Sequence, residues 1–198
     1  MPTLWKSDSP EEWRAALDSY EAVIERQGVA RLAELDRWYR EELPAAIAAR
    51  RAPHVTHEEL VRVTEWKMAR GIFRPRNLVL VRGNPPETVV KTSTAALAAI
   101  PDSKRPIALL AELDGVGPAT ASAIAAAAAP DVYPFFDELV GAQVPGLGTV
   151  AFTPAYYAKY AAALRDRAEA LGAPWTPSTV EQALWAHVGG KAGMRKGK

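Results

Sequence analysis

The chain has 198 residues, of which 48% are hydrophobic and 24% are charged, and these proportions are typical of a globular protein. It has no cysteine, which excludes disulfides, a thiolate-bound iron–sulfur cluster and a cysteine nucleophile. The formal net charge is only +1, so any binding of nucleic acid must come from local basic patches.

The chain offers few ligands for a metal ion. Of its three histidines, His54 and His57 are close in sequence and His187 is remote. The spacing of the first two suits a metal pair, but no cysteine supplements them. We therefore expect no metal and no cofactor.

The first residues lack the apolar segment of a signal peptide, and no apolar run approaches the length of a membrane span. We therefore expect a cytoplasmic protein without a membrane partner. If the protein binds DNA, its expected location is the nucleoid.

Helix-capping signals recur along the chain and predict an all-α fold. In each signal a serine or threonine is followed by a proline, by a glutamate three residues later, or by both. The four signals are at Ser9, Thr56, Thr153 and Thr176. Apolar residues at helical spacing follow, for example Trp13, Leu17, Tyr20 and Ile24 after the first signal. A further run places Leu32, Leu35, Trp38 and Leu43 on one helix face.

The segment 77–81 is apolar and β-branched, but an isolated strand would have no partner, so we expect a buried helical turn or a helix. Helices over 87–99 and 106–113 then lead to an alanine-rich helix over 118–128.

The pattern predicts three regions. Residues 1–52 form an N-terminal helical extension that packs on the main domain. Residues 53–188 form that helical domain, with a helical hairpin at 106–129. Residues 189–198 are rich in glycine and lysine and are expected to be a flexible basic tail.

The most specific signal is the segment Leu113-Asp114-Gly115-Val116-Gly117-Pro118-Ala119-Thr120-Ala121. The two glycines let the backbone turn sharply and approach another surface, while Val116 packs the turn against the helices behind it. Pro118 presets the first turn of a new helix. The start of that helix presents free N–H groups and a positive dipole end, which suits a DNA phosphate. The alternative is a tight turn between two helices that binds nothing.

These residues resemble the hairpin of the helix-hairpin-helix DNA glycosylase superfamily (HhH-GPD), whose motif reads Leu-Pro-Gly-Val-Gly followed by Thr-Ala. The chain departs from it in having Asp114 where the family has proline. The resemblance implies a glycosylase-like helical fold that binds double-stranded DNA through Gly115, Val116, Gly117, Ala119 and Thr120. Without cysteines, the chain would be a divergent member that lacks an iron–sulfur cluster.

A catalytic aspartate follows the hairpin of that superfamily at a fixed distance, and the residue at that distance from Gly115 is Asp137. Cleavage of an N-glycosidic bond builds positive charge on the sugar, which a fixed carboxylate stabilises while it orients a water. Asp137 is therefore the expected catalytic residue. It is also well placed to cap a helix that begins there, and the two roles are compatible.

Bifunctional members of the superfamily carry a nucleophilic lysine at the position that is Ala119 here, and alanine cannot form a Schiff base. The resemblance therefore implies a monofunctional glycosylase with water as the nucleophile. Lys67 and Lys104 are other lysines to consider, but nothing in their spacing supports such a role.

A flipped base needs aromatic surface and hydrogen bonds. Phe135 and Phe136 adjoin Asp137, and Trp66 is a third candidate for the base pocket. Core packing is the ordinary alternative for each of these aromatic side chains.

Cations without an intervening acid gather in the segment 67–76. We expect phosphate contacts from this segment and from the residue just before the hairpin, namely from Arg70, Arg74, Arg76 and Lys104. The alternative is a solvated face with ion pairs to Glu59 or Glu65.

Three hypotheses follow from the sequence. The first is a monofunctional DNA glycosylase of base-excision repair, in which Asp137 supports hydrolysis. The second is a non-catalytic DNA-binding module with the same hairpin. The third is a helical scaffold or interaction domain in which the hairpin is only a turn, and the near-neutral charge keeps this hypothesis open.

Overall fold

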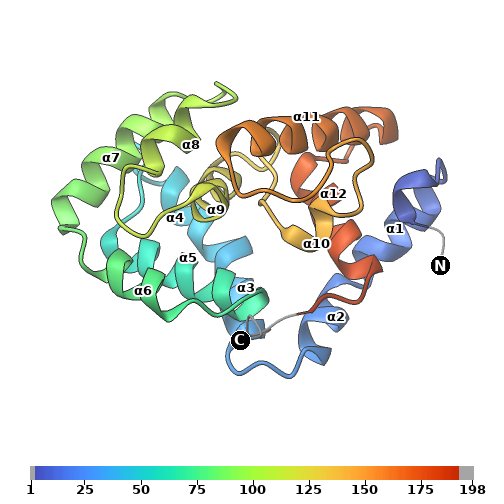
Figure 1. Cartoon of the computed structure of the whole chain (residues 1–198), viewed down its shortest axis with the longest axis horizontal. Coiled ribbons are helices and arrows are strands. Elements are labelled where there is room, and N and C mark those ends of the chain that lie inside the picture. The colour runs from blue at the N-terminus through green and yellow to red at the C-terminus, as the bar shows by residue number, and fades with distance from the viewer. Residues whose placement is uncertain (1–2, 192–198) are drawn as a thin grey trace.

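The computed structural model describes residues 3–191, and the fold is all-α with no strand in that part of the chain (Figure 1). In chain order the helices are η1 (Leu4–Lys6), α1 (Pro10–Asp18), α2 (Tyr20–Arg26), α3 (Leu32–Arg37), the π-helix η2 (Trp38–Glu42), α4 (Leu43–Ala48), α5 (His57–Arg70), α6 (Pro75–Arg82), α7 (Pro86–Ala98), α8 (Arg105–Leu110), α9 (Pro118–Ala128), α10 (Glu138–Gly141), α11 (Pro154–Leu171) and α12 (Pro177–His187).

The four capping signals begin helices where the sequence predicts them. The Thr56 hydroxyl accepts the Glu59 N–H while the Glu59 carboxylate accepts the Thr56 N–H, so α5 begins with a complete capping box. Ser9 and Thr153 cap α1 and α11 through single hydrogen bonds, and Thr176 caps α12.

Two helix boundaries and the geometry of one helix differ from those expected. The first helix is interrupted at Ser19, which divides it into α1 and α2. The second run is one continuous helical path whose middle, η2, has π geometry. The helix expected over 106–113 ends at Leu110, because Ala111 to Gly117 form a compact turn.

The segment 77–81 is helical, as expected, and belongs to α6. It is less buried than the pattern suggests. Val81 is fully buried, whereas Val79 and Leu80 are 68% and 41% exposed.

The alanine-rich helix α9 lies at the centre of the molecule (Figure 1), and its residues 119–127 are all buried. Small side chains let neighbouring helices approach it closely, and α4, α5 and α8 pack against it. The start of α9 thereby comes to lie beside α5 and α6, which position the site described below.

The first 52 residues share one hydrophobic core with the rest of the chain. Helix α1 packs along α12, α3 packs on α5 and α4 packs on α9. Trp13, which is fully buried, makes edge-to-face contacts with Trp5 and Trp175 from the two ends of the described chain. Of the expected basic tail, residues 192–198 lie outside the described residues.

Candidate functional site

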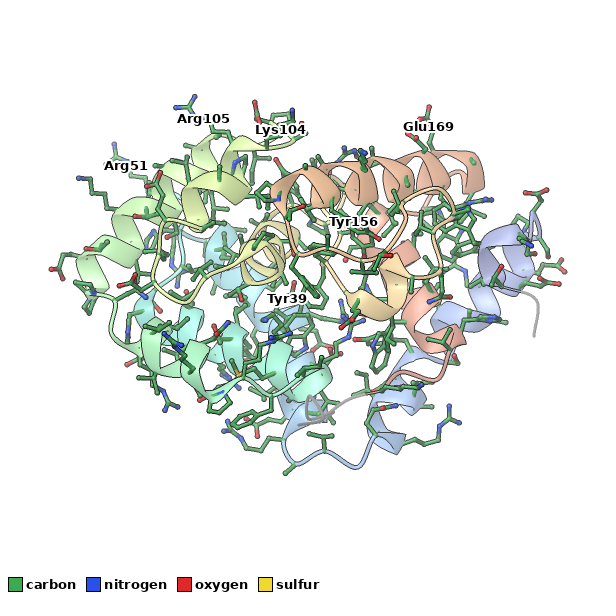
Figure 2. All side chains as sticks on the ribbon, in the orientation of Figure 1. Tyr39, Arg51, Lys104, Arg105, Tyr156 and Glu169 are labelled. Carbon is green, nitrogen blue, oxygen red and sulfur yellow. The ribbon has the colours of Figure 1, made fainter. Side chains whose placement is uncertain are left out.

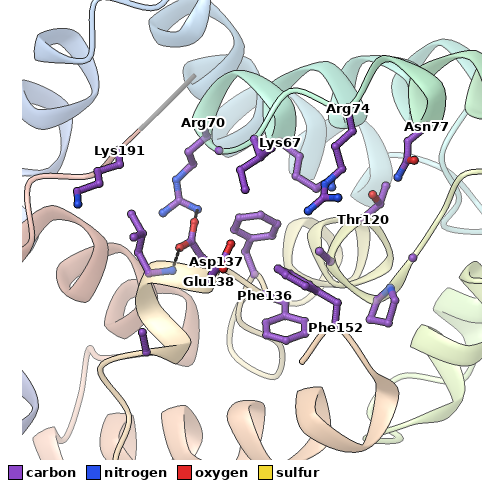
Figure 3. Close-up of a pocket in the computed structure, with 18 residues that line it drawn as sticks. Lys67, Arg70, Arg74, Asn77, Thr120, Phe136, Asp137, Glu138, Phe152 and Lys191 are labelled. Atoms are coloured by element: carbon purple, nitrogen blue, oxygen red, sulfur yellow. Dashed lines mark hydrogen bonds and ion pairs between the residues drawn. The ribbon is translucent and has the colours of Figure 1, made fainter. Parts of the chain in front are cut away.

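A pocket of about 680 Å³ opens where α5, α6, α9 and α10 converge (Figure 3). Its lining brings together side chains that are far apart in the sequence: Lys67, Arg74, Thr120, Phe136, Asp137 and Phe152. The volume lies within the range of sites that bind small molecules or extruded bases.

Asp137 lies in the wall of this pocket and also caps α10. Its Oδ1 accepts hydrogen bonds from the backbone N–H groups of Leu139 (2.8 Å) and Val140 (3.3 Å). Its Oδ2 accepts none from the described residues and lies 3.6 Å from Arg70 Nη1. One carboxylate oxygen is therefore fixed by the helix, while the carboxylate as a whole lines the cavity.

Arg70 does not fit the phosphate contact expected of it. Its side chain is fully buried, and its Nη2 donates a 2.6 Å hydrogen bond to Oε1 of the buried Glu181. The guanidinium also lies over the rings of Trp185 (4.6 Å) and Phe135 (5.1 Å). This burial corrects the sequence expectation, because a guanidinium held inside the protein cannot reach DNA.

Glu181, on α12, is the partner of Arg70, and the sequence did not indicate it. Burial raises the pKa of its carboxyl group, and the adjacent Arg70 opposes that effect. The two residues are 111 positions apart, so only the packing of α5 near α12 brings them together. Arg70 thus joins Glu181 to Asp137 in one buried ionic chain.

Trp66 also lies elsewhere than expected. It is fully buried, stacks on Tyr39 with ring centroids 3.6 Å apart, and donates through Nε1 to Asp36 Oδ1 at 2.8 Å. It is not among the residues that line the pocket. Trp66 packs α5 against η2. It is therefore a core residue and not the base contact that the sequence predicts.

The two phenylalanines before Asp137 line the pocket with mostly buried rings. Phe136 lies 5.0 Å from Phe152, measured between ring centroids. Phe152 is 42% exposed and belongs to the pocket wall, yet its loop carries no motif that could have identified it from the sequence. These rings supply an apolar lining beside the carboxylate.

The turn between α8 and α9 is fixed to α6. Gly115 has a φ of +76°, and a Cβ atom there would lie 2.6 Å from the Asn77 carbonyl oxygen. The Asn84 side chain accepts the N–H of Asp114 and donates to its carbonyl, both at 2.9 Å. Gly115 and the buried Val116 therefore face the protein interior, and neither lines the pocket.

The start of α9 faces the pocket instead. Gly117, Ala119 and Thr120 line it, and their N–H groups find no acceptor within residues 3–191. Free N–H groups at the positive end of a helix of eleven residues favour an anion.

The expected basic residues divide into three groups. Arg74 lines the pocket near Lys67, while Arg76 is exposed on α6 outside the lining. Lys104 is exposed at the outer end of α8, next to Arg105 (Figure 2), and the structure does not bring it to the pocket. The charged lining consists of four cations and two acids: Lys67, Arg70, Arg74, Lys191, Asp137 and Glu138.

Lys67 has an unusual environment. Burial lowers the pKa of its amine to about 8, and the positive charge of Arg74 adds to this effect. No carboxylate of the described chain lies within ion-pair distance of it.

Within residues 3–191, no group of three or more histidine, aspartate or glutamate side chains is placed to hold a metal ion. No helix in the same part of the chain is both long and apolar enough to cross a membrane. No protein-family model, curated protein or solved structure matches this chain.

Proposed function

We propose that the protein binds duplex DNA and hydrolyses the N-glycosidic bond of a base that is flipped into the pocket, in the manner of a base-excision glycosylase. The observation that carries the proposal is the shared location of two features. The Asp137 carboxylate and the free N–H groups at the start of α9 line one open, mainly cationic pocket.

Phosphate binding rests on the start of α9 and on Arg74. The N–H groups of Gly117, Ala119 and Thr120 offer donors at the positive end of the helix dipole. Arg74 adds a positive charge to the same pocket lining. Together they can hold the backbone of one strand while the nucleotide beside it leaves the stack.

The base would be held by the aromatic part of the pocket. Phe136 and Phe152 lie within stacking distance of each other, and Phe152 keeps much of its surface exposed. A flipped base gains stacking and exclusion from water there, which offsets part of the cost of unstacking.

Hydrolysis would depend on Asp137. Two backbone N–H groups fix its Oδ1, so its Oδ2 has a defined position beside the cavity. As the base leaves, positive charge develops on the sugar, and the carboxylate stabilises it and orients the attacking water. Arg70 lies 3.6 Å from the same oxygen and forms an ion pair with it. Because position 119 is alanine, the hairpin helix supplies no amine for this step.

The test is base release from duplexes that each carry one damaged base. We expect the wild type to release at least one base, and Asp137→Asn to lower that rate by roughly 100-fold or more while duplex binding is retained. Asparagine is itself a good helix cap, so the variant preserves α10. Glu169→Gln, a similar change on the exposed face of α11, is the matched control. Equal base release by the wild type and Asp137→Asn would refute the proposal.

A non-catalytic DNA-binding module is the second candidate, and one observation favours it. Asp137 is only 8% exposed, and its oxygens already serve a helix cap and an ion pair. This candidate predicts salt-dependent duplex binding without release of any base. The absence of any nucleic-acid binding would favour the third hypothesis, a helical scaffold.

A further inference from the structure

The guanidinium of Arg70 contacts two carboxylates, one at the pocket and one in the interior. Its Nη1 lies 3.6 Å from Asp137 Oδ2 at the pocket wall (Figure 3). Its Nη2 donates a 2.6 Å hydrogen bond to Glu181 Oε1 on α12. The rigid fork of a guanidinium suits this double contact. Glu181 is not among the residues that line the pocket, so the contact that links it to the pocket is the one with Arg70.

Aromatic rings hold this guanidinium in place. Its Cζ lies 4.6 Å from the ring centroid of Trp185 and 5.1 Å from that of Phe135. The rings of Trp66 and Tyr20 follow at 5.6 and 5.8 Å. A cation over the face of an aromatic ring is attracted to it, and Arg70 is also fully buried. The guanidinium therefore has one defined position between the two carboxylates.

The ion pair between Arg70 and Glu181 is a costly way to join two helices. Both charges lose their hydration, and Arg70 Nε, Arg70 Nη1 and Glu181 Oε2 have no hydrogen-bond partner within residues 3–191. Apolar residues of similar volume often stabilise such a position as well or better. Departures of this kind from the rules of core packing are expected mainly at functional sites. Because the pair lies one contact away from a pocket carboxylate, a role in the site is the natural explanation.

The way in which Asp137 is held shows what that role can be. The backbone N–H groups of Leu139 and Val140 fix its Oδ1. A carboxylate fixed at one oxygen can still swing the other, because the terminal torsion of an aspartate side chain has a broad minimum. The Arg70 charge, 3.6 Å from Oδ2, attracts that oxygen and so sets the plane of the carboxylate.

Building on the function proposed above, we propose that Arg70 and Glu181 are positioning residues for base release. Arg70 orients the free oxygen of Asp137, and Glu181 holds Arg70 in the place from which it does so. The reaction is sensitive to such placement, since a displacement of about 1 Å can lower a rate by roughly 100-fold.

The test is a double-mutant cycle on the full chain, in which single-turnover base release and duplex affinity are measured separately. Glu181→Gln keeps the shape of the side chain but removes its charge, so we expect base release to fall by roughly 10-fold or more, with duplex affinity unchanged. In the Asp137→Asn background the same substitution should not lower the residual rate further, because the carboxylate through which it acts is gone. Glu169→Gln, on the exposed face of α11, is the matched control.

The cycle distinguishes positioning from a merely structural role. A general loss of folded structure would lower the rate by the same factor in both backgrounds. If Glu181→Gln reduces the folded fraction, the second variant is Arg70→Met with Glu181→Leu, which leaves neither of the two charges uncompensated by the other. The folded double variant should release base at least as slowly as Glu181→Gln. Release at the wild-type rate would show that Asp137 does not need the pair.

Hydrogen exchange supplies a readout that requires no activity. The amides of Leu139 and Val140 donate to Asp137 Oδ1 at 2.8 and 3.3 Å, so their exchange reports how firmly the carboxylate is held. Glu181→Gln should speed the exchange of these two amides relative to the amides in the middle of α11. A uniform change at all amides would indicate lower stability alone and would contradict the proposal.

The outcomes separate this proposal from the one on which it rests. If the wild type releases a base and Glu181→Gln releases it equally fast, or if the two substitutions are additive, the positioning proposal fails and the glycosylase proposal stands. If the wild type releases no base from any duplex, the glycosylase proposal fails. In that case the exchange of the two amides alone decides whether Arg70 and Glu181 position the carboxylate, and an unchanged relative rate would refute this as well.

Discussion

Two glycines in the turn between α8 and α9 differ in what surrounds them. Gly115 has a positive φ, and a Cβ atom there would meet the backbone of α6 at 2.6 Å. Gly117 has a φ of −96°, and a Cβ atom there would meet nothing within 4 Å. The fold therefore requires glycine at position 115, whereas packing does not require it at position 117.

We expect Gly115→Ala to lower the free energy of unfolding by roughly 2 kcal/mol or more, from left-handed strain together with overpacking against α6. Gly117→Ala should change it by less than about 0.5 kcal/mol. Urea denaturation of the two variants measures the difference. Similar stabilities for both would show that the turn is not packed against α6 as described.

At the scale of the elements, a buried ion pair links α5 to α12. Arg70 and Glu181 are both fully buried and lie 2.6 Å apart. Removing one partner leaves the other charge uncompensated in the interior. Replacing both by apolar residues of similar volume removes that penalty for the pair itself, while Asp137 loses the Arg70 charge 3.6 Å away.

Glu181→Ala should therefore destabilise the protein by about 3–5 kcal/mol. The double variant Arg70→Met with Glu181→Leu should recover much of this loss, as measured by thermal or urea denaturation. If the double variant is less stable than Glu181→Ala alone, the ion pair stabilises the fold by more than the neutralisation of two buried charges. That result would contradict the role given to the pair here.

The sequence predicts the helices better than it predicts the site. Capping signals such as Thr56 with Glu59 act within one turn, so their hydrogen bonds follow from local spacing. The break at Ser19 and the π geometry of η2 differ from the expected helices, and both have local causes: the Ser19 hydroxyl donates to the Ala16 carbonyl, and Pro44, just after η2, lacks the N–H that a regular helix uses.

For the site, the spacing from Gly115 that the resemblance implies points to Asp137, and the structure places this residue in the pocket lining. The burial of Arg70 and Trp66 could not be identified in this way. Both lie on the inner face of α5, and the partners that cover them come from α12 and from the first 52 residues. A run of cations in sequence does not reveal which of its members turns inward.

At the scale of the whole molecule, the net charge of +1 makes the location of the cations more important than their number. If the pocket binds DNA, phosphate affinity comes from the start of α9 and from basic side chains in and around the pocket. Of the basic residues expected to contact DNA, Arg74 lines the pocket and Arg76 is exposed nearby in sequence, whereas Arg70 is buried.

Arg74→Ala should weaken duplex binding and reduce the slope of log affinity against log salt concentration by about 1, because one phosphate contact is lost. Arg51→Ala is the matched control, since Arg51 is exposed and lies outside the pocket lining. Fluorescence anisotropy over a series of salt concentrations measures both. An unchanged slope for Arg74→Ala would place the DNA on another face.

The central claim is that the Asp137 pocket cleaves the bond between a flipped base and its sugar. The most direct measurement is single-turnover release of the free base from a damaged duplex by the wild type and by Asp137→Asn. We expect release by the wild type and a rate lower by roughly 100-fold or more for the variant, with duplex affinity preserved. Equal rates for the two proteins, or no base released by the wild type from any duplex, would contradict it.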